Sequence, residues 1–208
     1  MTPERRWWSN LVRVLYAPRG VFADLREQET DDVDARQEPV LLVVLLAGMA
    51  AVLASPVAGR LLDDGDYDGL LVAIWTFVSG GIYGFAVYML GGLALWLGVR
   101  GMGGLDADWR SARHVLAFAF APVALSLLVV LPVRLAAFGG DAFRSGGSDG
   151  GAGGALAWAL QAAFVAWSLA LLVIGLRIVY GFSWGRAAGT FGLVALFLAA
   201  MAALPAAL

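Results

Sequence analysis

Five long apolar runs, separated by polar segments, follow a polar stretch of 38 residues at the start of the chain. None of the runs contains Asp, Glu, Arg, Lys or His; they cover residues 39–59, 69–99, 115–133, 150–176 and 187–208. A helix needs about 20 residues to cross a hydrocarbon core about 30 Å thick. The pattern therefore predicts an all-α integral membrane protein, a five-transmembrane-helix bundle with spans at about 39–59, 76–98, 114–134, 154–177 and 187–206.

The second run, residues 69–99, is too long for one upright span. At roughly 1.5 Å per residue it would form a helix of about 46 Å. We expect one span in its C-terminal part and a kink or an interfacial turn near Ser79, Gly80 and Gly81. A re-entrant segment at residues 69–80 stays open as an alternative.

Residues 1–38 are too acidic, and too long before the first apolar run, for a signal peptide. Helical spacing within them places Trp8, Leu11, Val12 and Leu15 on one stripe, and a second short segment starts at Pro18. This pattern predicts an amphipathic interfacial helix at about 7–26, followed by an acidic linker at 27–38. The segment is either a membrane-resting anchor packed on the bundle or a platform for a partner. Its candidate contact residues are Trp7, Trp8, Leu11, Leu15, Pro18 and Phe22.

The distribution of arginine predicts the orientation. If the N-terminus is cytoplasmic, eleven of the fourteen basic residues lie on the cytoplasmic side and three lie outside. Positively charged loops are retained in the cytoplasm. We therefore expect the N-terminus to be cytoplasmic and the C-terminus to be outside.

Composition supports a lipid environment. The chain is 61% hydrophobic and 14% charged, with a mean hydropathy of +0.79, whereas soluble domains are roughly half apolar and about a quarter charged. A net charge of −2 gives no reason to expect nucleic acid as a partner. Every basic residue is arginine, which we interpret as the codon bias of a GC-rich genome. The expected location is the plasma membrane of a prokaryote.

Small residues and one proline mark points of helix contact and bending. Glycines recur at helical spacing in the second and fifth runs: Gly80, Gly84, Gly91, Gly185, Gly189 and Gly192. In lipid, close backbone approach at such positions holds helices together, within one bundle or between two copies. Pro122 lies in the third span and should kink it. The glycine- and serine-rich residues 139–154 predict a flexible outer loop without structure of its own.

The sequence offers no catalytic, cofactor-binding or metal-binding set. It has no cysteine, and His114 is its single histidine. The five runs lack the ionisable groups that proton and ion pathways place inside a membrane. The polar residues that remain, such as Gln161, Ser168, Tyr83 and Tyr88, form no nucleophile–base pair. These features indicate a protein that is not an enzyme.

The order of several short motifs resembles the Yip domain family, the Ypt/Rab-interacting proteins, over about residues 11–206. The motifs are Leu15-x-x-Pro18-x-x-x-Phe22, Gly103-Gly104, Arg110, Arg113, Ala121-Pro122, Gly175-Leu176-Arg177, Tyr180-Gly181 and Gly185-Arg186-Ala187. The resemblance implies five spans and a cytoplasmic N-terminus. For eukaryotic relatives it implies binding to prenylated Rab GTPases and a role in vesicle traffic; a prokaryotic chain has no such pathway.

The leading hypothesis is a non-enzymatic membrane scaffold that organises the bilayer or a protein partner at its cytoplasmic face. The protein partner could also be a second copy of the chain. The alternative is a small transporter or channel subunit for an apolar or lipid-like substrate, which a continuous cavity beside Gln161, Ser168, Tyr83 or Tyr88 would favour. A membrane-embedded enzyme that uses His114 is a third hypothesis.

Overall fold

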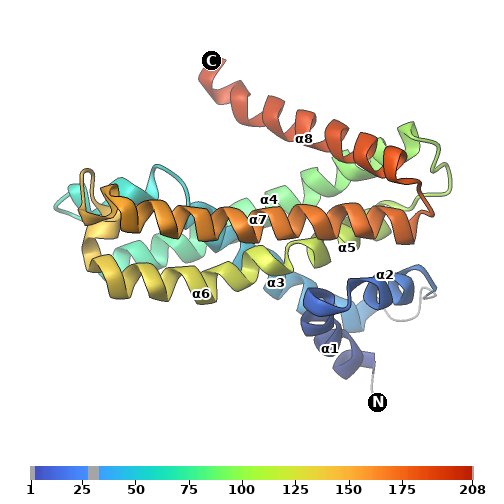
Figure 1. The fold of residues 1–208 in the computed structure, drawn as a ribbon, viewed down its shortest axis with the longest axis horizontal. Helices are drawn as coiled ribbons and strands as arrows, with labels where there is room; N and C mark the ends of the chain where they lie inside the picture. Colours follow the sequence, from blue (N-terminus) through green and yellow to red (C-terminus); the bar gives the residue numbers. More distant parts are fainter. Residues whose placement is uncertain (1–2, 28–32, 208) are drawn as a thin grey trace. The chain divides into compact units, whose positions relative to one another are not determined.

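The computed structural model describes the backbone of residues 3–27 and 33–207, and the side chains of residues 7–26 and 40–196. Over the described backbone the chain is helical and has no strand (Figure 1). The α-helices are α1 (Pro3–Tyr16), α2 (Pro18–Glu27), α3 (Val33–Leu53), α4 (Gly69–Gly101), α5 (Trp109–Ala119), α6 (Ala121–Phe138), α7 (Ala152–Val179) and α8 (Trp184–Ala207). Short 3-10 helices lie in the described loops: η2 (Ala58–Asp63), η3 (Gly139–Phe143) and η4 (Ser148–Gly150).

Polar side chains at the loop ends fix where several helices begin. Asp68 accepts the backbone N–H of Leu71 at 2.8 Å ahead of α4, and Asp108 accepts that of Ser111 at 3.2 Å ahead of α5. Such caps satisfy backbone donors that have no partner in the first helical turn. Helix α2 starts at Pro18, which suits the first position of a helix because proline has no N–H to leave unpaired.

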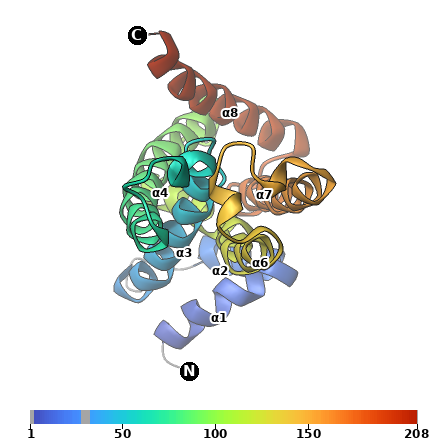
Figure 2. The ribbon, with the colours of Figure 1, turned by 90° about the vertical axis from the view of Figure 1, so that its left-hand side faces the viewer.

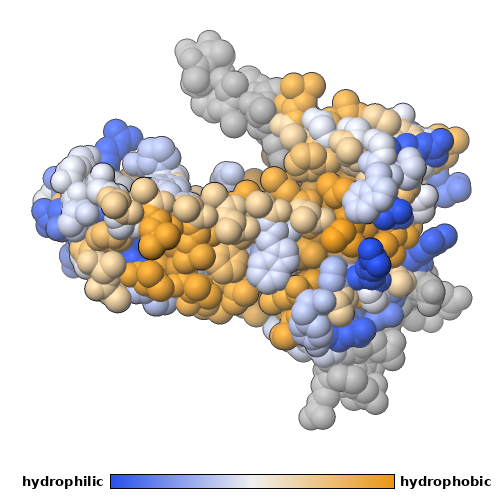
Figure 3. Space-filling model, viewed as in Figure 1, coloured by the Kyte–Doolittle hydropathy of each residue, from blue (hydrophilic) through white to orange (hydrophobic). Residues whose placement is uncertain are grey.

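The chain divides into two compact units. Unit 1 contains Met1–Val40, Ala86–Ala119 and Leu169–Leu208; unit 2 contains Leu41–Phe85 and Phe120–Ser168. Helices α4 and α7 therefore contribute one half to each unit. On the face drawn in Figure 3, hydrophobic residues cover the middle of unit 2 and hydrophilic residues gather at its loop end.

The core of unit 1 joins the N-terminal helices to the transmembrane helices. Trp7 is fully buried, and its ring lies 5.6 Å from that of Phe118 on α5. Phe22 of α2 is also fully buried and lies against Gly175 of α7, where an added Cβ would be 3.0 Å from the ring. Burial of two large aromatic rings fixes α1 and α2 to this unit.

The core of unit 2 includes a close crossing of α3 and α4. A Cβ added at Gly48 would lie 2.0 Å from the carbonyl oxygen of Gly80, and one at Gly84 would lie 2.3 Å from that of Val44. Only glycine allows the two backbones to approach this closely. Dispersion at such contacts stabilises helix pairs in lipid.

Three segments are long and apolar enough to cross a membrane within the described part of the chain: Gly69–Gly101, Trp109–Phe143 and Ala152–Val179. In Gly69–Gly101, only 22% of the most apolar stretch is buried in the protein. In Ala152–Val179, only 28% of the most apolar stretch is buried. Water would make these exposed apolar faces costly, at about 25 cal/mol per Å². A bilayer is the environment that suits them.

The first predicted span, 39–59, extends beyond the helix that forms there, because α3 ends at Leu53. The apolar part of α3 is Val40–Leu53, and a turn and η2 follow it. Pro56 explains the early end, because proline lacks an N–H and disfavours helical geometry at the residue before it. Residues 33–38, predicted as part of an acidic linker, instead form the first turns of α3; residues 28–32 of that linker lie outside the described residues.

The second and third predicted spans also differ in detail. Helix α4 is continuous from Gly69 to Gly101, so residues 69–80 are neither a separate interfacial turn nor a re-entrant segment. The third span is interrupted at Phe120, and Pro122 lies in the first turn of α6. The interruption falls where the sequence predicted a kink, because the proline ring would crowd a carbonyl one turn back in a continuous helix.

Candidate functional surface at the N-terminal helices and the interhelical loops

Helices α1 and α2 form a hairpin with one face turned into unit 1. Trp7, Asn10 and Val14 of α1 are fully buried, and Val21 and Phe22 of α2 are buried with them. The guanidinium of Arg13 donates to the Asn10 side-chain oxygen at 3.2 Å and lies 3.5 Å from the carboxylate of Asp24. This partly exposed ion pair adds at most about 1 kcal/mol. The buried rings therefore supply most of the attachment.

The opposite face of α1 is apolar and exposed. Trp8 is 40% exposed, Val12 is 60% exposed and Tyr16 is 73% exposed, at one-turn spacing. Leu11 and Leu15 are half-buried beside this face, and Pro18 is half-buried at the start of α2. We call Trp8, Val12 and Tyr16 the outward face of α1. It is an aromatic and aliphatic surface of the kind that rests in a membrane interface or against a partner.

Of the six residues predicted to face the membrane or a partner, two are buried in the structure and four are at least partly exposed. Trp7 and Phe22 lie in the core of unit 1, so they cannot contact a partner in this structure. Hydrophobic residues on α1 occupy both sides of the helix, and helical spacing alone could not show which side packs inward. Val12 was part of the predicted stripe but not among the six candidate contact residues, and only Tyr16 was first identified from the structure.

Three arginines at the ends of the helices of unit 1 stack on tryptophan rings. The guanidinium of Arg100 is 5.0 Å from the ring centroid of Trp96, that of Arg113 is 4.3 Å from Trp109, and that of Arg177 is 4.0 Å from Trp184. None of these guanidinium groups has a carboxylate within 4 Å among the described side chains. Cation–π pairs keep such charges near the apolar boundary, and both side-chain types concentrate at membrane–water interfaces.

The glycines predicted to pack helices behave in two ways. Gly80 and Gly84 contact α3, and Gly91 contacts Leu116 at 3.0 Å from an added Cβ. Gly189 lies against Met102 at 2.9 Å, but Gly185 and Gly192 have nothing within 4 Å of an added Cβ. The glycine face of α4 is therefore occupied within the chain. It is not free for a second copy.

Two polar residues within the spans, Gln161 and Ser126, bond to each other. The amide of Gln161 donates to the hydroxyl of Ser126 at 3.1 Å, and that hydroxyl donates to the carbonyl of Val123 at 2.6 Å. The hollow beside them holds about 30 Å³, roughly the volume of one water. His114, expected at the boundary, is 5% exposed within α5. Among the described residues no group of three or more His, Cys, Asp or Glu could hold a metal ion.

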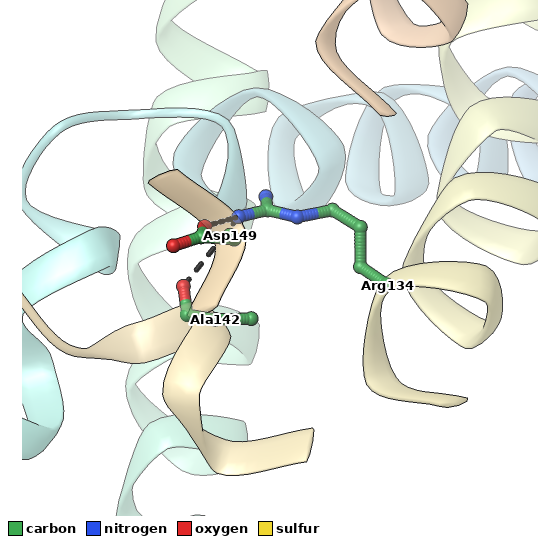
Figure 4. Close-up of polar contacts among 3 residues, drawn as sticks. All are labelled: Arg134, Ala142 and Asp149. Carbon is green, nitrogen blue, oxygen red and sulfur yellow. Dashed lines mark hydrogen bonds and ion pairs between the residues drawn. The ribbon is translucent and has the colours of Figure 1, made fainter. Parts of the chain in front are cut away.

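The loop at residues 139–150 is structured, so the prediction of a flexible segment was wrong. Ala142 and Phe143 pack with Ala58, Leu61 and Val72 in a buried cluster. Arg134 lies 3.0 Å from the carboxylate of Asp149 and donates to the carbonyl of Ala142 at 3.5 Å (Figure 4). Seen from this end of unit 2, η2 and the segment 139–150 lie side by side (Figure 2).

A hydrogen bond between distant residues also closes this loop. The backbone N–H of Ser145 donates to the carboxylate of Asp63 at 2.9 Å. Hydrogen bonds from the Ser145 hydroxyl and backbone hold the pKa of Asp63 below its usual range; burial opposes this shift, and the charges of Arg144 and Arg60 add to it. The glycine and serine content of the loop could not predict these contacts, because they depend on residues far away in the sequence.

Long apolar helices with lipid-suited faces, and arginine–tryptophan pairs at their ends, define a helical membrane protein. The family model of the Yip1 domain matches residues 12–204, nearly the whole chain, and the chain belongs to this family. No curated protein and no solved structure matches it.

Proposed function

We propose that this Yip1-family protein is a non-enzymatic membrane scaffold that organises a protein partner, or the local bilayer, at its cytoplasmic face. It spans the membrane five times, with the N-terminus in the cytoplasm and the C-terminus outside, in the plasma membrane of a prokaryote. The arginine distribution supports this orientation, because eleven of fourteen basic residues fall on the cytoplasmic side. A role like that in vesicle traffic would apply only in a eukaryote.

The outward face of α1 carries the proposal. Buried Trp7 and Phe22 hold the hairpin on unit 1, and the helix presents Trp8, Val12 and Tyr16 away from it. A pre-organised aromatic surface loses little conformational entropy on binding. Tryptophan and tyrosine are also the residue types that dominate binding energy at protein interfaces.

The transport alternative receives no support from the polar residues that suggested it. The hollow beside Gln161 has room for roughly one water, and Tyr83 is 50% exposed on the surface of unit 2. A substrate of lipid size would need a cavity of several hundred Å³ beside these residues. The scaffold hypothesis needs only a surface, so it fits these contacts better.

Crosslinking in native membranes tests the scaffold. Deletion of the hairpin would remove Trp7 and Phe22 from the core, so substitution of the exposed face is the sharper experiment. We expect the full chain with Trp8→Gln, Val12→Gln and Tyr16→Gln to lose most of its crosslinked protein partner. Val57→Gln changes a residue of similar exposure, 52%, in the loop of unit 2, and should have no effect. Equal recovery from the parent protein and both variants would contradict a protein partner on this face and leave α1 a membrane anchor.

A further inference from the structure

A polar hollow of about 450 Å³ lies within unit 1. Its walls come from the end of α2, the loop before α5, the first turn of α5, the loop after α7 and the start of α8. The polar side chains that line it are Arg26, Asp106, Asp108, Ser111, Tyr180 and Arg186. Cavities that bind small ligands have volumes of about 300–1,000 Å³, so this one can hold a small polar group.

Four formal charges, two of each sign, line this hollow without pairing. Arg26 and Arg186 supply two guanidinium groups, and Asp106 and Asp108 supply two carboxylates. Among the described residues none of the four has an opposite charge within 4 Å, whereas Arg13 and Arg134 each have one. The hollow therefore keeps cations and anions apart and leaves both available to a ligand that carries both charges.

The walls of the hollow are fixed before any ligand arrives. The indole N–H of Trp96 donates to the carbonyl of Ala107 at 2.9 Å, and the N–H of Gly104 donates to the carbonyl of Val99 at 2.9 Å. Gly103 and Gly181 have φ of 93° and 64°, a conformation that glycine adopts without strain as a helix ends. Pre-organised walls reduce the entropy that binding costs.

The hollow lies where the spans end. The loop at residues 103–108 follows α4 and precedes the segment that starts at Trp109, and the loop at 180–182 follows α7; all three segments are long enough to cross the bilayer. Arg100 and Arg177 stack on tryptophans at the same helix ends. Such pairs are typical of head-group depth. A phospholipid head group is therefore the polar group nearest to the hollow.

We propose that the hollow binds a phosphate–amine head group, that of phosphatidylethanolamine, with the phosphate on Arg26 and Arg186 and the ammonium on Asp106 and Asp108. Guanidinium groups bind phosphate through paired hydrogen bonds, and a primary ammonium donates three hydrogen bonds to carboxylates. Phosphatidylglycerol would bring its phosphate beside two carboxylates without an ammonium to neutralise them. A choline head group has no N–H to donate. This site requires the membrane location of the family and does not depend on the scaffold role.

Native mass spectrometry of the full chain in maltoside detergent tests the site. The protein is offered phosphatidylethanolamine, phosphatidylcholine and phosphatidylglycerol in equal amounts. We expect phosphatidylethanolamine to be retained about tenfold over either competitor, since loss of one charge-assisted hydrogen bond changes affinity at least about tenfold. The pair Arg26→Gln and Arg186→Gln should lower the retention of all three lipids, because each carries the phosphate, and the pair Asp106→Asn and Asp108→Asn should abolish the preference for phosphatidylethanolamine. Asparagine at position 108 preserves the helix cap.

Matched controls and a soluble competitor decide the outcome. Arg100→Gln and Asp66→Asn change the same residue types outside the hollow and should leave the preference intact. Equal retention of the three lipids by the unchanged protein would overturn the site. Undiminished retention of all three lipids in the arginine pair, or an undiminished preference in the aspartate pair, would also overturn it. Free phosphoethanolamine should displace the lipid at millimolar concentration. Its binding without retention of lipid would support the head-group chemistry and overturn the lipid as its source.

Discussion

The guanidinium of Arg134 lies 3.0 Å from a carboxylate oxygen of Asp149, fifteen residues later in the chain. The contact joins the last turns of α6 to η4, ahead of α7. Arg134 also stacks on Trp158 of α7, with 5.6 Å between the guanidinium carbon and the ring centroid. One side chain thus ties together the loop end of unit 2.

Asp149→Asn should destabilise unit 2. The side chain of Arg134 is only 15% exposed, so removal of its counter-charge leaves a largely buried cation without a carboxylate partner. The expected loss is about 1–3 kcal/mol. Thermal unfolding of the purified protein in detergent measures it as a lower Tm. Asp141→Asn makes the same change at an exposed position of the same loop that has no ion pair, and a Tm lowered equally by both variants would contradict the role of the Arg134 contact.

Acidification should loosen the loop at residues 139–150. The folded-state pKa of Asp63 lies below that of the unfolded chain because Ser145 donates hydrogen bonds to the carboxylate. Its contribution to stability is therefore complete above the unfolded-state pKa of about 3.9, and it is lost as the pH falls through the lower folded-state value. A spin label at Ser148→Cys should become more mobile over that window.

The same label gives the control for Asp63. In Asp63→Asn the loop should already be mobile at pH 7 and should change little on acidification, because the group that titrates is absent. A label in the variant that stays as immobile as in the parent protein would show that Asp63 does not hold the loop.

Helical class, membrane location and family were readable from the sequence because each depends on local pattern. Helix α7 covers Ala152–Val179, around the span predicted at 154–177. The length of the uncharged run is nearly sufficient to predict such a helix. The length of the charge-free run predicted a helix that continues to residue 59, but α3 ends at Leu53. Pro56 disrupts helical geometry locally and strongly, and this effect is larger than the preference of the apolar run for a helix.

Contacts between distant residues were not readable. Ser145 pairs with Asp63 across 82 positions, and Trp7 and Trp8 differ only in which side of α1 meets α5. The charges around the polar hollow come from α2, the loop before α5 and the first turn of α8, and no one of these segments by itself indicates a site. Such features are set by tertiary packing, whose partners are not encoded in any one window of sequence.

Gly84→Ala should destabilise the crossing of α3 and α4. An added Cβ would lie 2.3 Å from the carbonyl oxygen of Val44, so the two backbones must separate. Overpacking of this kind costs about 1–3 kcal/mol, measured as a lower Tm in detergent. Gly192→Ala is the matched control, since nothing lies within 4 Å of its added Cβ. It should be neutral or slightly stabilising, because alanine favours a helix over glycine by up to about 1 kcal/mol. Equal Tm values for the two variants would contradict the close crossing.

The proposed orientation predicts which loops a membrane-impermeant maleimide reaches in intact cells. The chain has no cysteine, so Leu105→Cys and Ser148→Cys each introduce a single thiol, and both positions are exposed. Ser148→Cys should be labelled in intact cells, and Leu105→Cys only after permeabilisation, because the arginine-rich loops stay in the cytoplasm. The reverse pattern would invert the orientation. Labelling of both thiols in intact cells would place the two loops on one side and exclude an odd number of crossings between them.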